Sequence, residues 1–284
     1  MTRHIIVIGD SSRMPELEDK SVHLIVTSPP YWNLKDYGTA NQIGQSDTSY
    51  MSYLNNLCKV FKECVRVLIP DGKLVINIMP IFLSGKNSPF RRRVTKTVLT
   101  DLEVFFNSLG NMYFHSLYIW DKRKIVRFSS FGSYPFPTNL FSTFPYEWII
   151  VFAKTGRRPH PSKRIKEKSK ITQEEWTNFC INSIWEMQPA SAKLEEHPAP
   201  FPEELPRRII KLYSFVGDTV LDPFLGTGTT MKVAKELDRN SVGYEINPKY
   251  LEIIKKKIGY GEQQLDKDLE YRIIVRSDEE DQTK

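Results

Sequence analysis

A proline-rich tetrapeptide follows a short apolar run near the N-terminus. Ser28-Pro29-Pro30-Tyr31 is separated only by Thr27 from residues 22–26, whose apolar pattern predicts a buried strand. Two consecutive prolines have fixed φ angles and no N–H groups, so they stiffen a loop and leave carbonyl groups exposed. The Ser28 hydroxyl and the Pro29 carbonyl could accept the two N–H groups of an exocyclic amine whose ring stacks on Tyr31. Taken alone, however, the tetrapeptide is better explained as a rigid turn.

A second motif, near the C-terminus, combines a glycine turn with two acids. Residues 219–222 predict a strand ending at Asp222, and Gly226 and Gly228 follow in a tight turn before a predicted helix. Glycines let the backbone approach a ligand, and a helix N-terminus offers free N–H groups. The motif lacks the Gly-Lys-Ser/Thr of a phosphate-binding loop and the GxGxxG of dinucleotide folds. An ordinary strand–helix turn is the alternative for the glycines alone.

The two acids of this second motif indicate what the ligand carries. Asp222 closes its strand, and an acid at that place suits an ammonium group better than a phosphate. Glu245, 23 residues later, ends the next predicted strand, where an acid suits the two hydroxyls of a ribose. The motif therefore points to a ligand that carries both an amino acid and a nucleoside.

Together the two motifs resemble those of the DNA amino-methyltransferases that use S-adenosyl-L-methionine to modify N4 of cytosine or N6 of adenine. The motif order resembles the β group of this family, of restriction-modification type, and the resemblance runs from residue 5 to about residue 258. It implies that Ser28, Pro29, Pro30 and Tyr31 are catalytic. It implies that the cofactor contacts Asp10, Asp222, Phe224, Gly226, Gly228, Thr229, Glu245, His197 and Pro198.

The resemblance also implies a chemistry without a covalent enzyme intermediate. None of the three cysteines follows a proline, which disfavours the cysteine-nucleophile route to C5-methylcytosine. Ser28, where many adenine enzymes of this family carry Asp, favours cytosine N4 over adenine N6. An RNA or protein amide methyltransferase and a DNA-binding protein without catalysis remain the less favoured alternatives.

The net charge of +6 is unevenly distributed along the chain. Residues 86–170 contain 17 Lys and Arg residues against five acids, a net charge of +12, which leaves −6 for the remainder. One basic cluster is typical of a solvated loop, whereas the three in this stretch, interleaved with aromatic residues, favour a surface that faces a polyanion. We therefore expect DNA contacts from Arg91, Arg92, Arg93, Lys122, Arg123, Arg157, Arg158 and Lys163.

Alternating strands and helices predict an α/β protein with a Rossmann-like methyltransferase fold, a mostly parallel doubly wound sheet and an inserted target-recognition region. We expect strands at 5–8, 22–26, 73–79, 112–120, 146–153, 219–222 and 241–245, and helices at 52–68, 97–109, 202–213, 228–237 and 248–258. The expected divisions are a catalytic half (1–154), a target-recognition region (155–196), a cofactor-binding half (197–262) and a C-terminal extension (263–284).

The order of the motifs along the chain predicts the order of the central strands. Strands 219–222, 241–245 and 5–10 must lie side by side to reach the amino acid, ribose and adenine of one cofactor. Strand 22–26 then lies on the other side of 219–222, across the topological switch point, which brings the methyl donor to the proline loop.

The sequence also argues against a membrane-spanning protein and against a metal site. No stretch approaches the roughly 20 apolar residues of a membrane span, and no histidine or cysteine spacing indicates a metal site. We expect a soluble cytoplasmic protein of a prokaryote. The resemblance implies double-stranded DNA as partner and is compatible with a cognate restriction endonuclease and with a homodimer.

Overall fold

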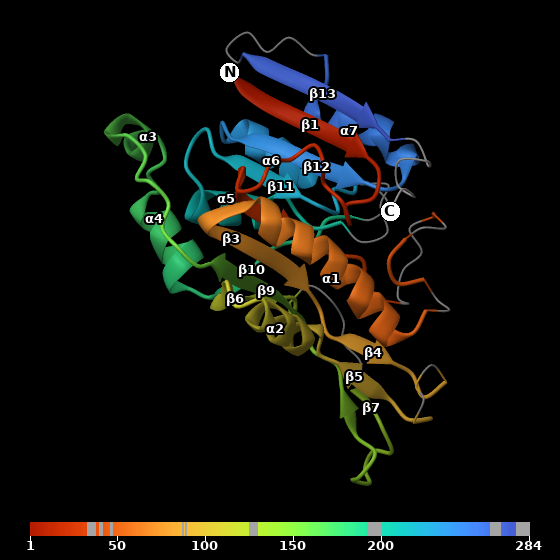
Figure 1. Ribbon diagram of the computed structural model, residues 1–284. Coiled ribbons are helices and arrows are strands. Elements are labelled where there is room, and N and C mark those ends of the chain that lie inside the picture. The colour runs from red at the N-terminus through yellow and green to blue at the C-terminus, as the bar shows by residue number, and fades with distance from the viewer. Residues whose placement is uncertain are drawn as a thin grey trace.

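A computed structural model describes residues 1–32, 38–39, 42–45, 48–86, 88, 90–124, 130–191, 200–261 and 268–276. Within these residues, nine strands form one central sheet in the order β10-β6-β9-β3-β2-β11-β12-β1-β13 (Figure 1), and among them β9 alone runs antiparallel to its neighbours. These strands are β1 (Thr2–Ile8), β2 (Val22–Thr27), β3 (Leu68–Ile78), β6 (Met112–Asp121), β9 (Tyr146–Lys154), β10 (Ile184–Glu186), β11 (Thr219–Asp222), β12 (Asn240–Glu245) and β13 (Leu269–Val275).

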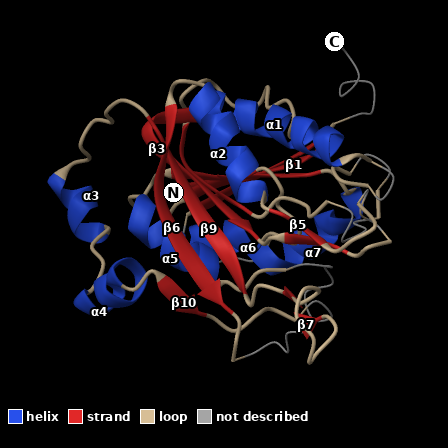
Figure 2. Cartoon of the chain, turned by 90° about the horizontal axis from the view of Figure 1, so that it is seen from below, coloured by secondary structure: helices blue, strands red, loops and turns tan. Residues whose placement is uncertain are grey.

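Helices cover both faces of this sheet, as predicted for a doubly wound fold. Figure 2 shows α1 and α2 on one face and α5 and α6 on the other. The helices are α1 (Tyr50–Val67), α2 (Val98–Ser108), α3 (Lys163–Lys168), α4 (Gln173–Glu175), α5 (Glu204–Tyr213), α6 (Thr229–Glu236) and α7 (Leu251–Ile258), with a π-helical segment, η1 (Trp176–Ile181), and a 3₁₀ turn, η2 (Pro248–Tyr250).

Strand β2 shows why its sequence is apolar without alternation. Ile25 packs into the core beneath α1, whereas Leu24 and Val26 pack into the core on the opposite face with Ile209 of α5 and Val233 of α6. The part of a parallel strand that is buried on both faces needs apolar residues at successive positions, as at Leu24, Ile25 and Val26. The same reasoning applies to β1, which lies between β12 and β13.

The predicted order of the central strands is confirmed. β11, β12 and β1 are neighbours, and β2 pairs with the other edge of β11. The chain therefore changes direction across the sheet between β2 and β11, and the carboxyl ends of these four strands converge at a topological switch point.

Strand β13 was not predicted, because residues 263–284 were expected to be an extension. It pairs in parallel with β1 from Thr2↔Leu269 to Ile8↔Val275, so it is an edge strand of the central sheet. The side chain of Arg276, directly after it, is 5% exposed and forms an ion pair of 2.6 Å with Glu16. This pair attaches the end of β13 to the segment that follows β1.

The described part of the chain also contains two antiparallel pairs of short strands that were not predicted. They are β4 (Ile81–Leu83) with β5 (Val94–Lys96), and β7 (Ser130–Phe131) with β8 (Phe141–Ser142). Strands of two or three residues are too short to produce a readable periodicity.

The segment expected to recognise the target begins at the edge of the sheet opposite the switch point. β9 is antiparallel, so its last residue, Lys154, lies at the amino ends of the parallel strands. Helices α3 and α4 extend from that edge, away from the arrowheads of the parallel strands (Figure 1). β10 then pairs in parallel with β6, where Trp185 is fully buried and stacks on Tyr118 with ring centroids 4.5 Å apart.

Arg158 forms an ion pair at this same edge. Its Nη1 and Nη2 each lie 2.9 Å from an oxygen of the Asp218 carboxylate, whose side chain is 8% exposed. The guanidinium also lies over the ring of Phe215, 5.0 Å from its centroid. The pair therefore connects the segment after β9 to the turn that precedes β11.

Removing this guanidinium should destabilise the fold. Arg158→Ala leaves the Asp218 carboxylate without its bidentate partner, which should lower the free energy of unfolding by about 3 kcal/mol. Arg157→Ala is the matched control, because Arg157 is exposed and a surface substitution should change stability by less than about 0.5 kcal/mol. Urea unfolding followed by circular dichroism measures both, and equal stabilities of the two variants would contradict the structural role.

Candidate active site

A pocket opens at the carboxyl ends of β1, β2, β11 and β12. Its empty volume, counting its open mouth, is about 700 Å³. Both sequence motifs contribute to it, although they lie near opposite ends of the chain. The lining residues are Gly9, Asp10, Ser11, Ser28, Pro30, Tyr31, Gln42, Ile43, Pro223, Phe224, Gly226, Tyr244, Glu245, Ile246 and Tyr250.

The proline loop is fixed by side chains from two other elements. The Tyr53 hydroxyl, from α1, donates a 3.1 Å hydrogen bond to the Pro30 carbonyl. Tyr31 is 7% exposed, and its hydroxyl donates a 3.4 Å hydrogen bond to the Glu147 carboxylate on β9. Lys122, which follows β6, forms an ion pair with the same carboxylate. The loop therefore depends on side chains as well as on its prolines.

Asp222 lies behind the pocket and does not line it. Its carboxylate accepts hydrogen bonds from the hydroxyls of Thr27, at 2.8 Å, and Thr230, at 2.7 Å, and from the backbone N–H of Phe224, at 3.1 Å. Burial raises its pKa to about 6, against the opposing effect of these hydrogen bonds. The sequence favoured a contact with a ligand's ammonium group, whereas in the structure this acid binds the protein's own hydroxyls.

Glu245 lines the pocket and also supports the glycine turn. Its Oε2 accepts the backbone N–H of Gly226 at 2.8 Å, and its Oε1 accepts that of Asn247 at 2.9 Å. Gly226 has φ +54°, which favours glycine over residues with a side chain. Burial raises the pKa of Glu245 to about 7; the backbone hydrogen bonds from Asn247 and Gly226 oppose this effect, and the neighbouring Asp222 carboxylate adds to it.

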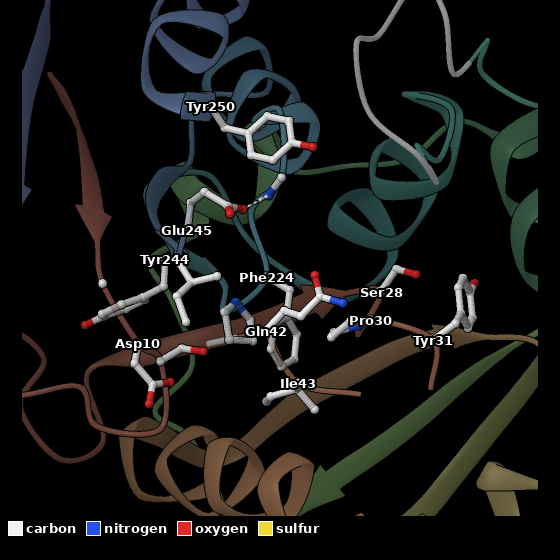
Figure 3. A pocket seen from close by; sticks show the side chains of 15 residues that line it. Asp10, Ser28, Pro30, Tyr31, Gln42, Ile43, Phe224, Tyr244, Glu245 and Tyr250 are labelled. Atoms are coloured by element: carbon white, nitrogen blue, oxygen red, sulfur yellow. Dashed lines mark hydrogen bonds between the residues drawn. The ribbon is translucent and has the colours of Figure 1, made fainter. Parts of the chain in front are cut away.

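Phe224 separates the two ends of the pocket. Figure 3 shows Glu245 and Tyr250 on one side of it and Ser28, Pro30 and Tyr31 on the other. Asp10, predicted to meet the adenine, lines the pocket on the Glu245 side, where its carboxylate accepts the Ser12 hydroxyl and backbone N–H. The predicted ribose acid and the predicted catalytic loop are thus parts of one continuous pocket.

Several residues of the site were not predicted from the sequence. Glu147 had a readable signal, because it is the single acid of strand β9, whose residues from Trp148 to Ala153 are apolar. Tyr250 follows Glu245 closely, and its aromatic ring lines the pocket. Tyr53 gave no signal, since its place on α1 is that of an ordinary core residue.

Two other predicted cofactor residues within the described part of the chain, Gly228 and Thr229, do not line the pocket. Gly228 has φ +89° and caps the N-terminus of α6. Thr229, the first residue of that helix, accepts a 3.1 Å hydrogen bond from Lys257 of α7. His197 and Pro198 lie outside the described residues.

The residues predicted to contact DNA do not share one surface. Arg91, Arg92 and Arg93 are exposed and line a groove with residues 130–133. Lys122 forms an ion pair with Glu147, the same carboxylate that accepts the Tyr31 hydroxyl. Arg123 is exposed and forms an ion pair of 2.7 Å with Asp121. The three remaining residues lie away from the pocket, at the amino ends of the parallel strands or in the segment that continues from that edge. They are Arg157, Arg158 and Lys163.

Fold and site together define a class of protein. The sheet is doubly wound and has a pocket at its switch point. That pocket combines an acid suited to a ribose with a rigid acceptor loop. This is the arrangement of a Rossmann-like methyltransferase that acts on an amine. A family model described as DNA methylase, covering the N6 and N4 enzymes, matches residues 22–256. The chain belongs to this family of DNA amino-methyltransferases.

Individual relatives agree with the family assignment. The chain is 35% identical to the Type II methyltransferase M.MjaI of Methanocaldococcus jannaschii, and the match covers 97% of each chain. It is 33% identical to the Type II methyltransferase M.MthZI of Methanothermobacter thermautotrophicus, over 90% of this chain and 77% of the relative.

Solved structures show the same fold. A protein of Thermus thermophilus described as a putative DNA modification methylase, solved with S-adenosyl-L-methionine, is 30% identical and superposes with a TM-score of 0.73 over 95% of this chain and 98% of the other. The PvuII DNA methyltransferase superposes with a TM-score of 0.62 at 18% identity, over 94% and 89% of the two chains.

S-adenosyl-L-methionine, the cofactor of the amino-methyltransferases, fits the pocket. The buried Glu245 carboxylate can accept ribose hydroxyls, and Phe224, Ile246 and Tyr250 supply an apolar and aromatic surface for a base. Within the described residues, no group of histidine, cysteine and acidic side chains could hold a metal ion. None of the described helices is both long and apolar enough to cross a membrane.

The raised pKa of Glu245 predicts a pH dependence of cofactor binding. The ionised carboxylate is the form that accepts two hydroxyl groups, so binding should release the proton that the empty site holds below pH 7. The Kd for S-adenosyl-L-methionine should therefore fall as pH rises from 6 to 8, by up to about tenfold per pH unit below the pKa. Isothermal titration calorimetry across this range measures the slope.

Two variants isolate the contribution of Glu245. Glu245→Gln should bind the cofactor more weakly. The pH dependence of its Kd that remains should come only from the titration of the ligand itself. Glu252→Gln, at an exposed acid of α7, should keep the slope of the natural protein. An unchanged slope in Glu245→Gln would show that another group holds the proton.

Proposed function

We propose that this chain is a site-specific DNA methyltransferase that modifies the exocyclic N4 of cytosine. The observation that carries this proposal is that Ser28 and Tyr31 line the same pocket as Glu245. A base that enters beside the proline loop would meet the methyl group of a cofactor whose ribose is held at Glu245. S-adenosyl-L-methionine supplies that methyl group in activated form.

The proline loop would act on the nucleophile. An aromatic amine is a poor nucleophile because its lone pair is delocalised into the ring. The Ser28 hydroxyl and the Pro29 carbonyl would each accept one N–H group of the amine and so localise the lone pair on nitrogen. The support from Tyr53 and Glu147 would hold these acceptors in place, so that positioning and electrostatic stabilisation supply the rate enhancement.

The target base must leave the duplex to reach this loop. Tyr31 is anchored through its hydroxyl, and its ring would stack on the extruded base and offset part of the unstacking cost. Ser28 at the first position of the motif favours cytosine.

Because the relatives are Type II methyltransferases, we also propose a cognate restriction endonuclease as a functional partner.

Three substitutions test the roles of the loop. Ser28→Ala and Tyr31→Ala should each lower kcat by at least about 100-fold, because each removes a group used in positioning the amine, while cofactor affinity is kept. Tyr31→Phe keeps the stacking ring and loses only the supporting Glu147 hydrogen bond, so it should lose less activity than Tyr31→Ala. Transfer of a radioactive methyl group to DNA and calorimetry with the cofactor give the two readouts. Full activity of Tyr31→Ala would rule out the stacking role.

The modified base can be identified directly. Genomic DNA that lacks methylation, treated with the protein and S-adenosyl-L-methionine and then sequenced as single molecules, should carry N4-methylcytosine within one short motif. N6-methyladenine would overturn the cytosine assignment and keep the amino-methyltransferase. Transfer to RNA or protein, with none to DNA, would overturn the proposed function.

A further inference from the structure

The short strands β4, β5, β7 and β8 belong to an arm that extends beyond the central sheet. We define the arm as residues 81–86, 88, 90–96 and 130–144. Figure 1 shows β4, β5 and β7 together beyond the arrowheads of the parallel strands, with α3 and α4 at the other side of the molecule, and Figure 2 shows the same separation. The arm therefore lies on the side of the sheet where the pocket opens.

Aromatic packing connects the arm to the catalytic strands. The ring of Phe82 lies 6.1 Å from that of Phe141 and 5.9 Å from that of Phe144, measured between centroids. Phe144 in turn lies 5.3 Å from Tyr146, which is the first residue of β9 and precedes Glu147. The arm is thus packed against the strand that anchors Tyr31.

The surface of the arm is basic and lacks acids. Its residues include five Lys and Arg side chains and no Asp or Glu. Arg91, Arg92 and Arg93 line an open groove together with Phe131, and the guanidinium of Arg93 lies 4.3 Å from the centroid of the Phe131 ring. A groove of this charge attracts a polyanion.

The outer end of the arm exposes large apolar side chains. Tyr134 is 91% exposed, Phe136 is 70% exposed and Leu140 is 63% exposed, and Phe90 is 69% exposed beside the arginines. Clustered apolar side chains in water are typical of a surface that a partner covers. A second copy of the chain would bring another set of arginines against the first, whereas DNA offers both phosphates for the arginines and base faces for the rings.

We propose that the arm is a target-recognition element, in place of the region 155–196 that the sequence suggested. Arg91, Arg92 and Arg93 bind phosphates beside the target base, and Tyr134 and Phe136 enter the stack next to it, as apolar wedges do in other DNA-bending proteins. This proposal rests on the proposed function, because it takes DNA as the substrate.

Salt dependence tests the phosphate contacts. In the triple variant Arg91→Ala/Arg92→Ala/Arg93→Ala, the negative slope of log K against log salt should become shallower by about 3, since each phosphate contact contributes about −0.9 to it. Lys163→Ala/Arg164→Ala/Lys166→Ala removes the same charge from exposed residues of α3 and should leave the slope unchanged. The probe is an unmethylated duplex that contains the sequence motif that the protein methylates, and binding is measured in the presence of S-adenosyl-homocysteine. A reduced slope in the α3 variant alone would overturn the proposal.

Specificity tests the aromatic contacts. Tyr134→Ala/Phe136→Ala should bind the cognate duplex at least about tenfold more weakly, a loss consistent with one stacked base, and bind an unrelated duplex as before. Both residues are exposed, and thermal unfolding checks that the variant is folded. An unchanged ratio of cognate to unrelated affinity would overturn the proposal, as would a change in oligomeric state without a change in DNA binding.

The two proposals fail in different ways. If the natural protein methylates DNA and the arm variants bind it with unchanged salt slope and unchanged specificity, the arm is not a recognition element and the proposed function stands. If the natural protein transfers no methyl group to DNA, the proposed function fails before the arm variants are compared.

Discussion

The active site depends on one buried carboxylate that binds three separate parts of the chain. Asp222 accepts the hydroxyl of Thr27 at the end of β2, the hydroxyl of Thr230 in α6 and the backbone N–H of Phe224 in the pocket wall. Thr27 directly precedes Ser28, so this carboxylate joins the acceptor loop to the cofactor loop. Burying an acid is unfavourable, which its raised pKa shows, and three hydrogen bonds offset that penalty.

Glu245 serves the same purpose at the next strand. One of its oxygens holds the N–H of Gly226, and so the shape of the glycine turn depends on an acid that also faces the pocket. Gly243 also lies close to this turn, because a Cβ at this position would lie 2.6 Å from the side chain of Leu225 and would force that side chain to shift. Cofactor contact and loop geometry are therefore coupled, since a substitution of Glu245 removes a ligand contact and a support of the loop together.

The sequence predicted the central strands and their order because each carries a motif at its carboxyl end. It did not predict the role of Asp222, because the partner Thr27 lies 195 residues away and has no distinctive neighbours. It did not predict β13, whose residues occupy intermediate and exposed positions with no continuous buried run. Tyr53 and Glu147 act by supporting the loop from other elements, and a support of this kind becomes visible only when the strands are placed side by side.

The basic middle of the chain shows why charge along a sequence does not define a surface. Because β9 is antiparallel, its first residue lies near the pocket and its last residue at the opposite edge, so the basic residues before and after it are separated by the length of the strand. Arg158, after β9, binds Asp218, while Lys122, which pairs with Glu147 at the start of β9, lies beside Tyr31. The direction of a single strand thus decides which of these cations can reach a substrate at the pocket and which stabilise the fold.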